Sequence, residues 1–271
     1  MSVLQDLIVK FNSKKNAELY TRIIKEIQSA EKIWTAFSDA SNNYYLGNVN
    51  GSATAYLFSE KDFFDIFYVH EKQKGYDVRS AENPAEYRMA LLADLYRSGF
   101  ETIIIDSGQT YLKMSLFDII KKPQEQTDNK DTRLIVNPSL MRTACWFFQE
   151  NAKEPANEEM WKLLFTEIFK AEYIVPADTR NLKIDGVKSG KIKLGKNSEV
   201  SFPVLQNSEG KSYYPFFTDW NELRKYDMNS NYSVLAANFK DLQRFAGKAD
   251  GIVINPYGAN IIPVSYTHLR A

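Results

Sequence analysis

Three short blocks of sequence recur in the same order along this chain, and their recurrence limits its possible architectures more than any other feature. Near Ser29 the chain reads "SAEKIWTAFSDA", and near Lys170 it reads "KAEYIVPADT". Further on, "ATAYLFSEKDFFDIF" is followed later by "KSYYPFFTDWNELRKY", and "FETIIIDSGQTYLKM" by "ADGIVINPYGANIIP". Chance explains one such match, whereas three in one order predict a duplicated unit. We therefore expect an α+β fold of two tandem pseudo-repeated modules, each a mixed or antiparallel sheet with flanking helices.

A polar stretch separates the predicted modules. We expect the first module over residues 1–122, a polar linker with a bridging helix over 123–156, and the second module over 157–263. The segment "KKPQEQTDNKDTR" cannot contribute to a core, and Asn137-Pro138 after it predicts a helix start. The final "VSYTHLRA", residues 264–271, resembles the translation of a sequencing adapter, so we exclude it from the fold and expect the native C-terminus to be missing.

Local signals predict the elements of the first module. Asn50-Gly51 is typical of a tight β-hairpin turn. The pattern from Ser59 to Asp62 predicts a capping box that opens an aromatic-rich helix, and Asn83-Pro84 predicts the start of another helix. Before these, the spacing of Leu19, Ile23 and Ile27 predicts the buried face of an amphipathic helix.

The second module carries similar signals. Asn157 is a predicted helix cap, and "YIVPAD" is a predicted strand. The segment "DGVKSGKIKLGKNSEV" predicts an extra hairpin that the first module lacks. Thr218 is expected to open a short helix, and residues 240–246 another.

The segment "VINPYGAN" predicts a turn in its own right. Asn255, Pro256 and Gly258 occupy the first, second and fourth positions that a type I turn favours. The Asn255 side chain is expected to bond to the backbone of this turn. A conformational role therefore suffices for these residues, and we favour it over catalysis.

Composition excludes several classes of function. Lys plus Arg equals Asp plus Glu, so the net charge of zero argues against a nucleic-acid binder and a polybasic membrane-surface protein. Cys145 is the single cysteine, which excludes an internal disulfide and fits a reducing compartment. The N-terminus lacks the apolar core of a signal peptide. We expect a cytoplasmic protein with no nucleic-acid or membrane partner.

The motifs that usually carry chemistry are weak here. "GKIKLGKN" almost matches a P-loop, but Asn197 replaces the required Ser or Thr and the alternation favours a surface hairpin. His70 is the one histidine before the excluded tail, so a multi-histidine metal site is not available. Cys145 lies among bulky apolar residues, which favours a buried, inert thiol over a nucleophile paired with His70. We expect no metal and no cofactor.

Carboxylates and aromatic residues supply the remaining candidates. Glu60 and Asp219 follow equivalent strands, but carboxylates at helix starts usually stabilise the helix. Asp39 and Asp178 lie at near-equivalent strand ends. Strand alternation must expose some members of the pairs Tyr44-Tyr45 and Tyr213-Tyr214, and we expect Trp220 to be exposed as well; exposed aromatic residues favour protein recognition.

From Glu158 to Pro263 the chain resembles the N-terminal domain of the SseB family. The residues that carry the resemblance are "YIVPAD", "SFPVLQNSEGKSYYPFFTDWNEL" and the closing "ADGIVINPYG". The first half matches only loosely, because Asp106-Ser107 stands in place of Asn-Pro and Trp34-Thr35 in place of Val-Pro. The resemblance implies an intracellular bacterial protein and no agreed catalytic residues.

Together these observations predict a non-catalytic, cytosolic interaction or regulatory module whose partner is another protein. The candidate binding residues are Trp220, Tyr213, Asn255, Asp178 and Asp219. The alternative is a small-ligand-binding protein or enzyme that uses carboxylates in a cleft between the modules. That alternative requires Asp178, Asp219 and Asn255 to converge on one concave pocket.

Overall fold

The computed structural model describes residues 2–122, 134–178, 184–188, 191–194, 201–240 and 249–263. These residues divide into two compact units. One unit contains the described residues up to 122 together with Pro138–Leu164. The other contains residues 134–137 and the described residues from Phe165 onward. No helix among the described residues is both long and apolar enough to cross a membrane.

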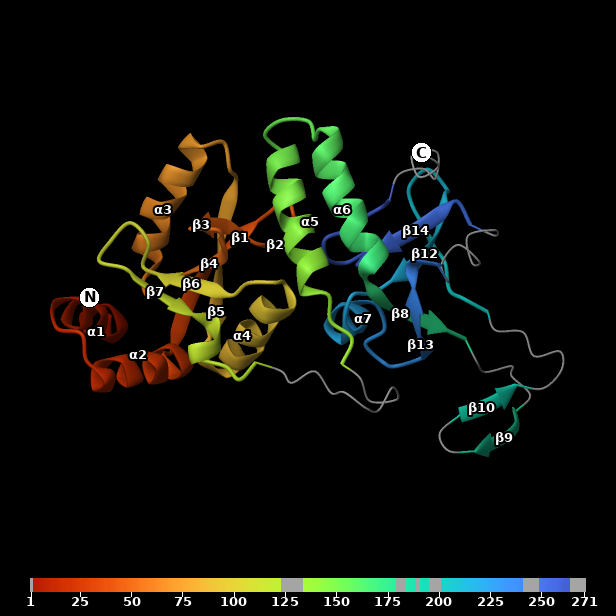
Figure 1. Cartoon of the computed structure of the whole chain (residues 1–271), viewed down its shortest axis with the longest axis horizontal. Helices are drawn as coiled ribbons and strands as arrows, with labels where there is room; N and C mark the ends of the chain where they lie inside the picture. Colours follow the sequence, from red (N-terminus) through yellow and green to blue (C-terminus); the bar gives the residue numbers. More distant parts are fainter. Residues whose placement is uncertain are drawn as a thin grey trace. The chain divides into compact units, whose positions relative to one another are not determined.

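The first unit is built on one seven-stranded sheet (Figure 1). Strand β1 pairs antiparallel with β2, β4 and β5, whereas β4 and β6 are parallel. Strand β7 pairs antiparallel with β6, and β3 with β4. The elements of this unit are α1 (Val3–Ser13), α2 (Ala17–Ser29), β1 (Lys32–Ser38), β2 (Asn43–Tyr44), β3 (Gly47–Val49), β4 (Ser52–Phe58), α3 (Lys61–Gln73), β5 (Val78–Pro84), the 3₁₀ turn Ala85–Tyr87, α4 (Arg88–Arg97), β6 (Thr102–Ile105), β7 (Leu112–Ser115), the 3₁₀ turn Leu116–Asp118 and α5 (Pro138–Asn151).

Helices cover both faces of this sheet. Side chains alternate along a strand, so Ala55 and Leu57 of β4 point to one face and Tyr56 and Phe58 to the other. The first pair packs with residues of α1, α2 and α4, and the second with residues of α3. Figure 1 accordingly shows α3 on one side of the sheet and α2 and α4 on the other.

The second unit is smaller, and its strands pair in a similar order. Strand β8 pairs antiparallel with β13, and β12 is parallel to β14 and antiparallel to β11. An isolated antiparallel bridge between Ile174 and Phe217 joins β8 to β12, and another joins Ile254 to Ile261. Helix α6 (Glu158–Lys170) begins in the first unit and ends in the second. The other elements of the second unit are β8 (Glu172–Ala177), β9 (Ile184–Lys188), β10 (Lys191–Leu194), β11 (Leu205–Gln206), β12 (Ser212–Phe216), α7 (Trp220–Tyr226), β13 (Ser233–Asn238) and β14 (Gly251–Ile254).

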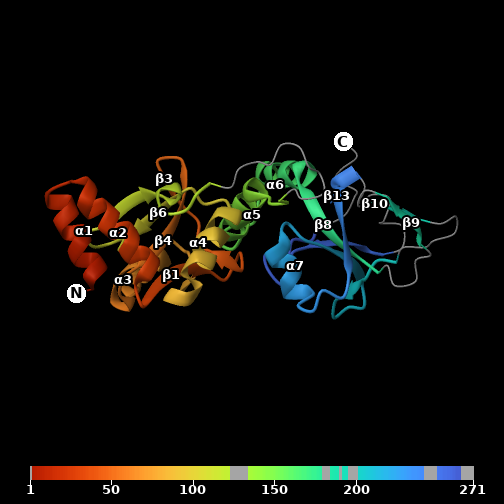
Figure 2. The same cartoon turned by 90° about the horizontal axis from the view of Figure 1, so that it is seen from below.

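The two units therefore share one pairing scheme. The first runs β5–β1–β4–β6–β7, and the second runs β13–β8–β12–β14 and ends on the Ile261 bridge. In both units the one parallel pair lies in the same place in this order. The α+β class predicted from the sequence is confirmed. Figure 2 shows α6 and α7 on opposite faces of the second sheet, and α7 packs against Ile174 and Phe217 through Leu223.

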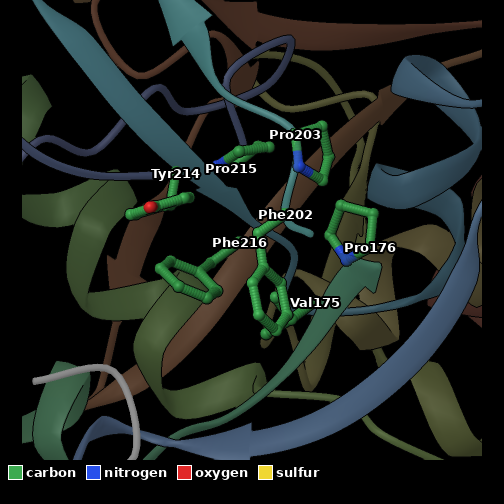
Figure 3. Close-up of a pocket in the computed structure, with 7 residues that line it drawn as sticks. All are labelled: Val175, Pro176, Phe202, Pro203, Tyr214, Pro215 and Phe216. Atoms are coloured by element: carbon green, nitrogen blue, oxygen red, sulfur yellow. The ribbon is translucent and has the colours of Figure 1, made fainter. Parts of the chain in front are cut away.

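Prolines explain why β8 and β12 meet at only one bridge. Ile174 and Phe217 exchange both backbone hydrogen bonds, at 2.9 and 3.0 Å. In an antiparallel ladder the next such pair lies two residues along, which places Pro176 opposite Pro215. Neither proline has an N–H to donate, so the ladder ends there. Phe202 and Pro203 lie beside this gap, and the small apolar hollow among the rings leaves no room for a water molecule (Figure 3).

Several local predictions are confirmed. Asn50 and Gly51 both have positive φ, 55° and 79°, in the turn between β3 and β4. The Asn157 side chain accepts a hydrogen bond from the Met160 N–H at 3.0 Å, as a helix cap does. Strands β9 and β10 form the extra hairpin.

Two local predictions are wrong. Asn83 and Pro84 end the edge strand β5 instead of opening a helix, and α4 begins at Arg88 after a 3₁₀ turn. The reason is tertiary, since Asn83 Oδ1 accepts a hydrogen bond from Arg88 Nε at 2.9 Å while β5 pairs along its whole length with β1. The capping box at Ser59 does not form either, because the Ser59 hydroxyl donates to Asp106 on a neighbouring strand end.

Three further predictions concern segments that lie wholly or mostly outside the described residues. The linker from residue 123 to 133 and the tail from 264 to 271 lie outside the described residues. The same holds for the helix predicted over residues 240–246, of which only Lys240 is described.

Candidate functional site

Each unit places a pair of polar residues at the carboxyl end of its parallel strands. Ser59 and Asp106 follow β4 and β6, and Thr218 and Asn255 follow β12 and β14. In open sheets this end of parallel strands is where ligand sites usually form. The chemistry of these four side chains therefore decides what the site can do.

In the second unit both polar atoms of the Asn255 side chain are engaged. Its Oδ1 accepts a hydrogen bond from the Thr218 N–H at 3.0 Å, and its Nδ2 donates to the Thr218 hydroxyl at 2.8 Å. Asn255 is fully buried, and its φ of 51° lies in the left-handed region that asparagine tolerates best. The Gly258 N–H donates to the Asn255 carbonyl at 2.9 Å, which closes the predicted turn. The Asn255 side chain thus reaches Thr218 at the end of the neighbouring strand, and its bond to the turn itself stays a prediction.

Asp219 continues this chain of hydrogen bonds. The Thr218 hydroxyl donates to one carboxylate oxygen of Asp219, at 3.2 Å. The other oxygen accepts from the N–H groups of Asn221 and Glu222, at 2.8 and 3.1 Å. Asp219 is therefore the N-cap of α7, which is the structural role that helix starts favour for carboxylates.

Asp178 lies at the other end of the second sheet. Ile174 is opposite Phe217, and Asp178 is four residues further along β8, about 13 Å away at the usual rise of a strand. Asp219 and Asn255 lie beyond Phe217 in the opposite direction. The three residues on which the alternative function depended do not converge within this unit.

The aromatic candidates differ in exposure. Trp220 is the first residue of α7, and 38% of its surface is exposed. Tyr213 on β12 is only half-buried, and its ring packs over Gly251. Tyr214 is buried. Of the predicted binding residues of the second unit, Trp220 therefore has the most accessible side chain.

In the first unit an acid takes the place of Asn255. Asp106 is fully buried, has a φ of 59°, and accepts hydrogen bonds from the N–H and hydroxyl of Ser59 at 2.7 and 2.8 Å. Burial raises the pKa of Asp106 from 3.8 to about 6, with a contribution from the charge of Glu60, although the Ser59 hydrogen bonds act in the opposite direction. This carboxyl is thus close to half-protonated just below neutral pH.

The reactive side chains singled out in the sequence lie apart. Cys145 is buried in α5, and burial raises the pKa of its thiol to about 12, so it is inert at neutral pH. His70 is exposed near the end of α3. Among the residues that the structure describes, no group of three or more His, Cys, Asp or Glu side chains is arranged to hold a metal ion.

The edge strand β13 was not predicted from the sequence as a candidate site. Its sequence "SVLAAN" has no charged residue and no proline, and most of its residues are exposed. Within the described residues β13 pairs with β8 alone. The signal was present in the sequence as an uncharged run, but an edge position cannot be read without the sheet order.

Comparisons with known proteins bear on the second half of the chain. Residues 150–271 match the family model of the SseB protein N-terminal domain. No curated protein matches the chain. Among solved structures, Tic22 from Plasmodium falciparum is similar over 81% of this chain and 84% of that one, with 14% identical residues and a TM-score of 0.19, which does not establish a shared fold. The match to the SseB protein N-terminal domain over residues 150–271 agrees with the resemblance predicted for the second half of the chain.

Proposed function

We propose that this chain is a non-catalytic interaction module that binds an extended segment of a partner protein along β13. The observation that carries the proposal is an exposed, uncharged edge strand that, within the described residues, pairs on one side only, with β8. Adding a strand to such an edge is a recurring mode of peptide recognition.

The register shows which backbone groups of β13 point outward. Ile174 uses its N–H and C=O to bond Phe217 on the other side of β8, so its pair with Ala236 is a non-hydrogen-bonded pair. The N–H and C=O of Ala236 therefore point away from β8. By the same alternation those of Val234 point outward too.

The side chains of β13 suit a protein partner. Leu235 is 43% exposed, while Val234 packs on the α7 side of the sheet. A partner strand would cover Leu235 and gain cross-strand contacts with it.

The matching edge of the first unit is protected. Strand β5 carries Arg79, Glu82 and Pro84, and charges and prolines are the residues that block pairing at edges. Arg79 is held by Asp39 at 2.6 Å and lies over the ring of Phe37. The difference between β5 and β13 favours the second unit as the one that binds a partner segment.

The predictions of a non-catalytic and cytoplasmic protein also belong to this proposal. The side chain of Asn255 is taken up by hydrogen bonds that link two strand ends, and that of Asp219 by hydrogen bonds that cap a helix, which supports a non-catalytic role. The shared pairing scheme supports the predicted duplication of one unit. The single cysteine and the SseB resemblance support a bacterial cytoplasmic protein, and Trp220 is retained as a second contact residue.

The test is a pair of variants at one position, Ala236→Pro and Ala236→Val. Proline removes the outward N–H without touching the ladder to β8, whereas valine keeps it. Peptides selected from a phage-displayed random library on the intact chain should bind the valine variant normally and the proline variant weakly. Equal binding to both variants would exclude strand addition at β13.

Light scattering on the same variants shows whether the strand that pairs with β13 comes from a second copy of the chain. If the chain is a dimer that Ala236→Pro dissociates, the strand that β13 accepts comes from a second copy, and the proposed partner is wrong. A cross-linkable residue at Leu235, compared with one at exposed Leu163 on α6, should capture a peptide segment only at position 235.

A further inference from the structure

The first unit contains a cavity of about 400 Å³ at the carboxyl end of β4 and β6. That volume lies in the range of small-molecule sites. The cavity is lined by Tyr56, Phe67, His70, Glu71, Gln73, Lys74, Ser107 and Gly108. It belongs to a different unit from β13, and its role does not depend on the function proposed above.

Three elements build this cavity. Phe67, His70, Glu71 and Lys74 recur at the three- and four-residue spacing that places side chains on one face of a helix, here α3 and the residue that follows it. Tyr56 contributes from β4, and its ring packs on that of Phe67 with centroids 4.6 Å apart. The turn after β6 closes the third side.

The one carboxylate in the lining is already neutralised. Glu71 accepts a hydrogen bond from the Tyr45 hydroxyl at 2.5 Å through one oxygen and from Lys74 Nζ at 2.7 Å through the other. Its side chain is 7% exposed. Glu71 therefore holds Lys74 at the cavity and adds no unpaired negative charge.

The remaining polar groups in the cavity lining are mainly hydrogen-bond donors. Lys74 has two further N–H bonds, and His70 and the hydroxyls of Tyr56 and Ser107 can also donate. Within the described residues, neither the Tyr56 hydroxyl nor the backbone N–H groups of Ser107 and Gly108 have a protein partner. Such a set, beside one apolar wall, is complementary to an anion with a short carbon skeleton.

At the equivalent place in the second unit, the described residues fill the space that the cavity occupies in the first. At the equivalent place the turn after β14 packs directly on α7, where a Cβ added to Gly258 would lie 2.4 Å from Glu222. Tyr257 of that turn stacks on Tyr226, with ring centroids 6.2 Å apart. In the first unit α3 has 13 residues, whereas α7 has 7. The turn after β6 also lacks the Pro-Tyr pair of the turn after β14, so the space between this turn and α3 stays open.

We propose that this cavity binds a small organic anion, a carboxylate or a phosphate monoester, with Lys74 and the turn at Ser107 as its main contacts. Titration calorimetry on the full chain at low salt, with citrate and glycerol phosphate as separate probes, tests it and distinguishes the two acids. At least one probe should bind saturably below about 10 mM. No saturable heat with either would overturn the proposal.

Matched variants locate the binding. Lys74→Gln should weaken the bound probe about tenfold, as loss of a charge-assisted hydrogen bond does. Lys61→Gln removes the same charge from the other end of α3, where Lys61 pairs with Asp65 outside the cavity, and should leave affinity unchanged. Equal losses in both variants would show binding to surface charge only.

Two readouts remain informative if Lys74→Gln disturbs the fold. Tyr56→Phe removes one hydroxyl, keeps the ring and should also weaken binding. Amide NMR shifts on titration should be largest at Ser107 and Gly108; shifts concentrated elsewhere would assign the anion to another site and exclude this one.

Discussion

Asp106→Asn should stabilise the first unit near neutral pH, because it replaces a buried carboxylate by the amide that the second unit uses at the same place. The hydrogen bonds survive the change: the new Oδ1 accepts from the Ser59 N–H and the new Nδ2 donates to the Ser59 hydroxyl, as Asn255 does with Thr218. Only the cost of burying a charge disappears. The variant therefore isolates one electrostatic contribution.

The magnitude follows from the pKa. Burial raises the pKa of Asp106 from 3.8 to about 6, a difference of about 2 units at about 1.4 kcal/mol each, or about 3 kcal/mol. Because the folded pKa is the higher one, the folded state holds its proton longer than the unfolded state. The stability of the wild-type unit is fully present below pH 3.8 and is lost as the pH rises to about 6. Asp106→Asn should show no such loss.

The assay is urea unfolding at pH 4 and pH 8, combined with hydrogen exchange at the amides of β6, which report on the first unit. We expect the variant to exceed wild type by about 1–3 kcal/mol at pH 8 and by only about 0.5 kcal/mol at pH 4. The reciprocal variant Asn255→Asp should destabilise the second unit at pH 8 and recover at pH 4. A gain for Asp106→Asn that is equal at both pH values, or a loss at pH 8, would refute the reasoning.

Four further predictions concern the helix cap, two glycines, a buried arginine and the buried thiol. Asp219→Ala should cost about 1 kcal/mol through loss of the α7 cap, and Asp219→Asn should restore most of it, as measured by chemical unfolding. Gly47→Ala would place a Cβ 2.4 Å from the Tyr56 hydroxyl and should cost about 1–3 kcal/mol, whereas Gly51→Ala meets no atom and should cost about 1 kcal/mol through its φ of 79° alone; equal thermal shifts would contradict this difference. Arg88→Met should cost about 3 kcal/mol or more in urea unfolding, because fully buried Arg88 donates to the carbonyls of Ile27, Ala30 and Asn83, which would lose their partner; a near-neutral result would show that water replaces it. Cys145 should react with a thiol reagent only after unfolding, and fast reaction of the native chain would show that the thiol is reachable.

The sequence was most reliable for features set by neighbours along the chain. The positive-φ pair Asn50-Gly51, the cap at Asn157 and the turn at Asn255 each depend on residues within four positions, and each forms as predicted. Prediction failed where a distant partner competes for the same group. Ser59 forms no capping box because Asp106, 47 residues away, accepts its hydroxyl.

The same difference between local and tertiary features holds for the candidate sites. The sequence identified Asp219 as a helix-start carboxylate and Cys145 as a buried thiol, because local spacing decides both roles. It did not identify β13 or the cavity beside Lys74, since an edge strand exists only relative to a sheet order and a cavity only relative to three separate elements.

By itself, then, the sequence determined the class of fold, the recurring blocks and the family resemblance of the second half, all of which are written in local patterns of polarity and turn residues. The tertiary structure alone decided which backbone groups β13 turns outward, why two facing prolines end the β8–β12 ladder, and which unit keeps an open cavity. The physical reason is that hydrogen-bond register and side-chain packing join residues far apart in the chain, and no local propensity specifies those partners.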